Sequence, residues 1–292
     1  MLFAVHLSDG VVTGAWAAGG WAVAAALLAL GGRRLTEDEI PRLGVLTAAF
    51  FVASQVHLPA GGVSVHLLLN GLLGVVLGGR AVLAVAVGLT LQALLLGHGG
   101  LVQTLGLNIA HYALPAVLAG AAFPPLLRSR LLHRPVPRFL VVTLVGWGWL
   151  LTAAVAMQTS WVKLGRGDWP EGWAGWWAAD PVLAGGLLAV AAGFALFERR
   201  LEADPAFPVG LLLGALTAWA TVGLTVLSLR FGGTATVADK AELVLLLHVP
   251  VVAVEAVGVG FVVAYLNRAK PEWLAGGQPA GSGNTSANGT SH

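Results

Sequence analysis

The sequence has no cysteine, and only 10% of its 292 residues are charged. The lack of cysteine excludes disulfide bonds and thiolate metal sites. Soluble domains carry roughly 25% charged residues, so the low value argues against a soluble protein. The formal net charge is only +2. No basic patch alternates with aromatic residues, so nothing in the sequence supports binding to nucleic acid.

Apolar residues are abundant instead: 57% of the chain is hydrophobic and the mean hydropathy is +0.81. A helix needs about 20 apolar residues to cross a hydrocarbon core roughly 30 Å thick. The sequence predicts nine hydrophobic segments, near residues 11–31, 43–58, 63–79, 81–97, 107–127, 139–158, 181–198, 208–228 and 241–266. The second to fourth are short and closely spaced, so we expect tilted or partly re-entrant segments there. The predicted fold is all-α, a polytopic transmembrane helix bundle over residues 1–270.

The basic residues predict how this bundle is oriented, because cytoplasmic loops of membrane proteins are enriched in Lys and Arg. With nine spans and the N-terminus outside, 12 of the 16 basic residues fall on the inner side. The exceptions are Lys163, Arg166, Arg230 and Lys240. This asymmetry favours an outer N-terminus and a cytoplasmic C-terminus.

Two stretches differ in composition from the predicted helices. Residues 160–180 contain five tryptophans, which suit the membrane interface, and we expect an outer interfacial loop or a short surface helix there. Residues 271–292 are rich in Gly, Ser and Asn, a composition typical of disordered segments. The sequence therefore predicts one membrane domain followed by a disordered polar tail.

Motifs for common enzyme chemistry are missing. The chain contains neither H-E-x-x-H nor G-x-S-x-G, so zinc-protease and serine-hydrolase motifs are excluded. A P-loop needs Lys followed by Ser or Thr, whereas the three lysines precede Leu164, Ala241 and Pro271. We expect a protein that is not an enzyme, and ATP-driven work would require a separate ATPase subunit.

Four histidines, His6, His57, His66 and His98, lie at or near the predicted outer ends of segments. Polar residues in a membrane chain are costly and are functional candidates by default. Converging neutral imidazoles suit Ni, Co, Cu or Zn. For any single histidine, an interfacial or hydrogen-bonded structural role is the alternative.

A buried carboxylate is predicted in the last segment. Glu255 follows His248 by seven residues, which places both on one face of a helix. A carboxylate in lipid needs a partner. One interpretation is a structural pair with His248, and the other is contact with a coupling subunit.

Three stretches together resemble the CbiM/NikM family. They are FVASQVHLPAGGVSVHLLLNGLLGVVLG (51–78), LQALLLGHGGLVQTLGLN (91–108) and HVPVVAVEAVGVGFVVAYLNRAKPEWL (248–274). The family comprises the cobalt- or nickel-binding membrane components of energy-coupling-factor transporters. The resemblance covers most of residues 5–127 and about 208–274, and residues 139–198 look like two helices more than the usual member has.

The resemblance implies a metal site at the N-terminus. In the family the mature chain begins Met-His, and the terminal amine, the second amide nitrogen and that histidine's imidazole chelate the metal. A histidine in the Gly/Ser-rich loop supplies a fourth nitrogen. By position, His6 and Asp9-Gly10 match the N-terminal motif and His66 matches the loop histidine. Four nitrogens in a plane suit Ni(II) and can hold Co(II).

This chain departs from the family pattern because His6 is the sixth residue and not the second. We hypothesise that Val5 is the true start, since a GTG codon initiates with methionine but is read as valine when the start is placed upstream. The metal ligands implied are then His6, His66 and the amine of residue 5. If Met1 is the start, a decayed or repurposed site is the alternative.

Further residues are expected to support this site without binding the ion directly. Asp9, Gln92 and Asn108 are expected to fix the short loops by hydrogen bonds, because irregular backbone at membrane depth must be satisfied by protein. His57 and His98 are candidates for support or for metal entry. No bound cofactor is expected, and the metal ion is the cargo.

The resemblance implies partners as well: two ATPase subunits, a transmembrane coupling subunit and a small two-span accessory subunit, in a bacterial inner membrane. Nickel and cobalt accept the same nitrogen donors, so the sequence does not separate them. Two rival functions stay open. One is a vitamin-binding subunit of the same transporter class, and the other is an intramembrane metalloenzyme using Asp9 as its carboxylate.

Overall fold

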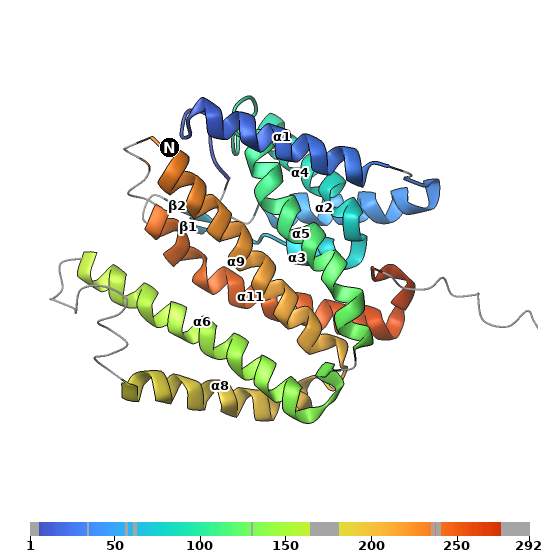
Figure 1. Cartoon of the computed structure of the whole chain (residues 1–292), viewed down its shortest axis with the longest axis vertical. Coiled ribbons are helices and arrows are strands. Elements are labelled where there is room, and N and C mark those ends of the chain that lie inside the picture. Colours follow the sequence, from blue (N-terminus) through green and yellow to red (C-terminus); the bar gives the residue numbers. More distant parts are fainter. Residues whose placement is uncertain are drawn as a thin grey trace, which may run out of the picture.

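The computed structural model describes residues 6–33, 35–55, 58–60, 63–129, 131–163, 181–234, 237 and 241–275. Within these ranges the chain is almost entirely helical (Figure 1). The α-helices are α1 (Gly14–Gly31), α2 (Ile40–Ala53), α3 (Asn70–Leu77), α4 (Ala81–Leu96), α5 (Leu105–Arg128), α6 (Pro135–Lys163), α8 (Pro181–Leu201), α9 (Ala206–Gly232) and α11 (Ala241–Ala269). A two-stranded antiparallel hairpin, β1 (Leu58–Ala60) and β2 (Val63–Val65), separates α2 from α3.

Six candidate membrane spans are long and apolar enough to cross a bilayer. They are Gly14–Gly31, Asn70–Leu96, Leu105–Arg128, Pro135–Ala154, Ala206–Gly232 and Leu243–Ala269. A polytopic helical membrane protein is thereby confirmed. Each predicted segment overlaps one of the helices named above, but α2 has only 14 residues and α3 only eight. Both are shorter than the roughly 20 residues of a full span, so nine spans stay a prediction.

The sequence predicted hydrophobic segments at 43–58 and 63–79, tilted or partly re-entrant, and no strand, whereas the hairpin lies where the first of these segments ends and the next begins. Leu58 pairs with Val65 and Ala60 with Val63, so the second segment ends and the third begins as strand. The β-branched residues Val63 and Val65 favour strands, and Pro59 cannot continue a helix. This hairpin shortens α3 and places the loop that carries His66 against the bundle.

Glycines allow the interior helices to approach closely, as expected in lipid. A Cβ at Gly74 of α3 would collide with the Ala116 carbonyl of α5, and one at Gly214 of α9 would lie 3.0 Å from the Ala256 Cα of α11. Side chains at these positions would separate the helices that carry the loop after His66. These two glycines therefore serve close contact between helices.

Contacts at the two ends of α4 show the direction in which it runs relative to α1. Arg80, between α3 and α4, donates to the Gly31 carbonyl (2.7 Å) at the C-terminal end of α1. Gly100, after α4, donates to the Leu7 carbonyl (2.9 Å), ahead of α1. Helix α4 therefore runs opposite to α1. The end of α9 also lies beside the start of α1, because Thr13 N–H donates to the Gly232 carbonyl (2.8 Å).

Helices α6 and α8 lie on the far side of the α9–α11 pair from α1 (Figure 1). They correspond to the additional residues 139–198. Between α6, α8, α9 and α11 is an apolar cavity of about 500 Å³, lined by Trp149 and Trp219 among others. The cavity is lined by none of the predicted site histidines.

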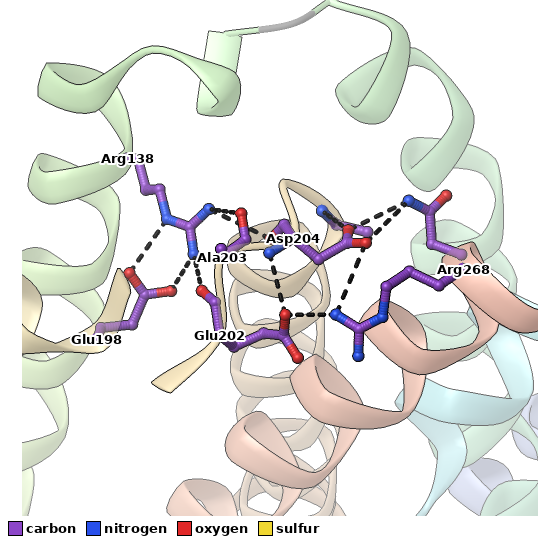
Figure 2. Close-up of polar contacts among 8 residues, drawn as sticks. Arg138, Glu198, Glu202, Ala203, Asp204 and Arg268 are labelled. Carbon is purple, nitrogen blue, oxygen red and sulfur yellow. Dashed lines mark hydrogen bonds and ion pairs between the residues drawn. The ribbon is translucent and has the colours of Figure 1, made fainter. Parts of the chain in front are cut away.

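A buried arginine fastens these additional helices to the rest of the bundle. Arg138 of α6 donates to both carboxylate oxygens of Glu198 of α8 (2.5 and 3.1 Å). It also donates to the carbonyls of Glu202, Ala203 and Asp204 (2.6 to 3.2 Å), as Figure 2 shows. Arg268 of α11 joins the cluster through Glu202 (2.5 Å). One end of α6, α8 and α11 is thus held by a continuous polar network.

Arg138→Ala is expected to lower the free energy of unfolding in detergent by about 3–5 kcal/mol, because removing one partner leaves the Glu198 charge buried and unpaired. Both side chains are about 98–99% buried. Thermal unfolding measures the change, and Arg134→Ala, at an exposed arginine directly before α6, is the matched control. Equal stability of the two variants would contradict a structural role for the pair.

Candidate metal site

The structure brings His6 and His66 together although 59 residues separate them. The centroids of their imidazole rings are 4.6 Å apart and the ring planes differ by 18°. Both side chains are buried, at 4% and 3% exposure. Because neutral imidazoles are ligands for borderline divalent metals, this pair is the structure's candidate for a metal site.

Tyr112 of α5 is a third aromatic residue of the site. Its ring stacks with that of His6 at a centroid distance of 4.9 Å and an interplanar angle of 19°, and Phe50 of α2 meets Tyr112 edge-on. Nothing in the sequence singled out Tyr112. Its only signal was a tyrosine within an apolar segment, which many buried positions share.

The loop between α4 and α5 holds the N-terminal segment through Asp9. The Asp9 carboxylate accepts N–H groups of four successive residues, 101–104, at 2.9 to 3.1 Å. Partial burial acts to raise the pKa of Asp9, but these four bonds outweigh it and hold the pKa below its ordinary value. A lowered pKa means that the ionised form stabilises this contact above about pH 4 and that the contribution is lost in stronger acid.

The backbone N–H and the backbone carbonyl of Leu7 are both hydrogen bonded to side chains. Asn108 of α5 accepts from Leu7 N–H (2.8 Å) and donates to the Leu7 carbonyl (2.9 Å). The Thr104 hydroxyl donates to the same carbonyl (2.6 Å). These bonds fix the backbone directly after His6. Asn108, which was expected to support the site, makes two of them.

Two glycines make this docking possible. Gly99 has φ +76°, which favours glycine, and a Cβ at this position would lie 3.5 Å from the Cβ of His6. At Gly100 a Cβ would collide with the Thr104 hydroxyl and the Asp9 carboxylate. The Gly-Gly pair therefore lets the loop close over residues 6–9.

His66 is oriented by its own loop. Its Nδ1 lies 2.8 Å from the Leu67 carbonyl, and this contact requires Nδ1–H to donate in neutral imidazole. The proton on Nδ1 leaves the lone pair on Nε2, the form that a metal needs. A hydrogen bond from the second ring nitrogen is the usual way in which proteins orient a metal-binding histidine.

The loop after His66 is bound by Glu255 of α11. The carboxylate accepts Leu68 N–H (2.6 Å) and Leu69 N–H (3.0 and 3.1 Å), whereas His248 Nδ1 contacts the Val244 carbonyl within its own helix (2.7 Å). The interpretation of Glu255 as the partner of His248 was therefore wrong. Spacing along the helix placed both on one face but could not reveal a loop from elsewhere in the chain.

The other predicted residues have different positions. Gln92 is buried and donates to the Ser54 hydroxyl (2.5 Å), so it joins α4 to α2 and not to the N-terminal segment. His98 follows α4 and is exposed. His57 and Val5 lie outside the described residues. Both ring nitrogens of His111 contact hydroxyls of α9, Nδ1 at 3.3 Å and Nε2 at 2.9 Å, which indicates a structural role.

Within the described ranges, no group of three or more His, Cys, Asp or Glu side chains is placed to hold a metal. The side chains of the described site therefore offer two imidazoles.

Comparisons with known proteins indicate the family of this chain. The family model described as "Cobalt uptake substrate-specific transmembrane region", CbiM, matches residues 6–178 and 182–273. A "Putative metal transport protein" of Haemophilus influenzae is 41% identical over 127 residues, which are 44% of this chain and 59% of that one. A "Putative fused nickel transport protein NikMN" of Archaeoglobus fulgidus is 34% identical over 119 residues, 40% of each chain.

The chain thus spans about three-fifths or less of these relatives. A crystal structure of a truncated transition metal transporter covers 90% of this chain and 98% of its own, at 18% identity and a TM-score of 0.47. The family match begins at His6 and runs through both loops of the site to Trp273. The chain therefore belongs to the CbiM family of cobalt uptake substrate-specific transmembrane regions.

Proposed function

We propose that this protein is the substrate-binding subunit of an energy-coupling-factor transporter that imports Co(II) or Ni(II). The observation that carries the proposal is the burial of His6 against His66, with the backbone on both sides of the pair fixed by hydrogen bonds. Family membership supports a transporter subunit in preference to an enzyme.

The proposed donor set has four nitrogens. The imidazoles of His6 and His66 supply two, and the amide of His6 and the amine of residue 5 supply the others. The amine and the adjacent amide close a five-membered chelate ring, and the amide and Nδ1 of His6 close a six-membered ring. A planar set of four nitrogens suits Ni(II). Translation from the codon of Val5 would place the amine where this chelate needs it.

The proposed topology has the site on the outer side and the C-terminus in the cytoplasm. At the end of the bundle opposite the site, Arg80 contacts the end of α1 and Arg42 contacts the carbonyls of residues 272 and 273. Basic residues gathered at one end support a cytoplasmic location for that end. The nine predicted segments and a bacterial inner membrane complete this proposal.

The proposed partners are two ATPase subunits, a transmembrane coupling subunit and a small two-span accessory subunit. The fused relative of Archaeoglobus fulgidus supports association with another transporter component. The basic stretch 128–138 is proposed to meet the coupling subunit. Lipid headgroups are the competing partner for the arginines of this stretch other than Arg138, which is buried in the bundle.

Two rival functions have less support. A vitamin would need a pocket lined by aromatic and polar groups, whereas the cavity between α6, α8, α9 and α11 is mostly apolar and is lined by neither His6 nor His66. A metalloenzyme would need a carboxylate base beside the histidines. Asp9, the candidate for that base, is occupied by four backbone N–H groups.

Uptake of radioactive nickel and cobalt by cells that express the chain with its transporter partners tests the proposal. We expect energy-dependent uptake of at least one ion, with each ion competing against the other, and uptake lost in His66→Ala. Uptake that is unchanged in His66→Ala, or that follows a vitamin and not a metal, would overturn it.

A further inference from the structure

Glu255 is a buried carboxylate that the proposed metal chelate does not itself use. It lies in the middle of α11, inside the candidate span Leu243–Ala269, and only 3% of its surface is exposed. A charged group at this depth is expensive and is functional by default. Its carboxylate accepts hydrogen bonds from backbone N–H groups of the loop that follows His66.

The loop bound by Glu255 has an unusual backbone. Leu69 has φ +49°, the only positive φ among non-glycine residues in the described part of the chain. A left-handed conformation is unfavourable for a residue with a side chain, so it persists only where surrounding contacts impose it. Here the contacts are the two carboxylate oxygens of Glu255, which bind Leu68 and Leu69 N–H.

The strained turn directly follows His66 in the chain, and its first residue contacts the His66 ring. Leu67 supplies the carbonyl that orients the His66 ring, and the next two residues are those held by Glu255. On the other side of this turn, α3 begins at Asn70, whose side chain donates to the Tyr112 carbonyl (3.1 Å) and to the Thr221 hydroxyl (2.7 Å). The turn therefore spans only residues 67–69 between the imidazole and a fixed helix.

We infer that Glu255 is a positioning residue of the metal site: its carboxylate holds the 67–69 turn so that His66 meets His6 in binding geometry. The inference rests on the proposed function. Glu255 acts on His66 through two backbone N–H groups of the turn and not as a ligand of the ion. The last helix of the bundle thereby contributes to a site whose ligands come from the first 66 residues.

Loss of the carboxylate should loosen the turn. Glu255→Ala leaves two buried N–H groups without this acceptor, and the turn is then free to leave the left-handed conformation. Partners that orient metal ligands typically contribute about 10–100-fold in metal affinity, so we expect Ni(II) to bind about 10–100-fold more weakly. Glu255→Gln keeps one oxygen that reaches both N–H groups, and it should retain most of the affinity.

The experiment compares Ni(II) binding by the purified protein, in the form that starts at position 5, and its variants in detergent, using calorimetry. His248→Leu is the matched control, because His248 is buried in the same helix but bonds within it. A Cu(II)-loaded sample adds a spectroscopic readout, since pulsed electron paramagnetic resonance counts bound imidazoles. We expect two imidazoles in the wild type, His248→Leu and Glu255→Gln, and one in Glu255→Ala.

Each outcome decides the inference. If Glu255→Ala does not fold, Glu255→Asp takes its place, because a side chain one methylene shorter cannot reach both N–H groups. If the variant that folds, Glu255→Ala or Glu255→Asp, has unchanged affinity for Ni(II) and two bound imidazoles, the positioning role is overturned. Equal losses of affinity in Glu255→Gln and Glu255→Ala would overturn it as well. If the wild type binds Ni(II) independently of His66, the proposed function fails as well, and this result is distinct from failure of Glu255 alone.

Discussion

Replacing His66 with alanine is expected to abolish tight binding of Ni(II) and Co(II), and replacing His6 is expected to do the same; these are the largest effects that follow from the proposed site. The two imidazoles are buried against each other, and no third metal-binding side chain joins them among the described residues. Among the described residues, neither histidine has a neighbouring ligand that could replace it. We expect the loss to exceed the roughly 10–100-fold typical of an outer supporting residue.

Calorimetry on detergent-purified protein measures this loss. His133→Ala is the control, because this histidine is exposed in a short helix at residues 131–133. Wild-type affinity should also fall as the pH is lowered, because binding must displace protons from the amine, the amide and the imidazoles. Tight binding that survives either His6→Ala or His66→Ala would show that the pair is not the site.

The second large effect concerns the residues ahead of His6. A chain that starts with methionine in place of Val5 presents a free amine one residue before His6, whereas the chain that keeps Met1 to Ala4 has an amide there. Chelation needs the amine as a donor. We expect the shorter form to bind Ni(II) at least about 100-fold more tightly, an order of magnitude consistent with losing a direct ligand rather than a supporting residue.

Both forms are made from the same gene with alternative start codons and compared by calorimetry. A third form that starts two residues earlier, with methionine at position 3, is the matched control, because its free amine is two residues too far from His6 to join the proposed chelate. Equal affinities for all three forms would contradict participation of the amine. Intact mass of protein from the native gene then tells which start the cell uses.

The sequence predicted the helical membrane class and the identity of the important loops, but for different reasons. Apolar runs such as 208–228 are long enough to identify helices by composition. The juxtaposition of His6 and His66 came from the family resemblance, since no spacing rule relates residues so far apart. The match of the family model across both loops supports that inference.

Other features could not be predicted because they depend on contacts distant in sequence. Arg138 and Glu198 are 60 residues apart and meet only after α6 and α8 come together. The hairpin at 58–65 was missed because three-residue strands are too short for an alternating pattern to be seen. Glu255 was identified as a costly buried charge, but its partners are backbone groups, which the sequence does not distinguish.

The X-ray absorption spectrum of the Ni(II)-loaded protein, in the form that starts at position 5, tests the central claim most directly. A planar ion with four nitrogen ligands is predicted, with outer-shell scattering from two imidazoles. In His66→Ala loaded at high nickel, one imidazole should be lost. A six-coordinate, oxygen-rich spectrum, or two imidazoles that persist in His66→Ala, would contradict a metal site built from His6 and His66.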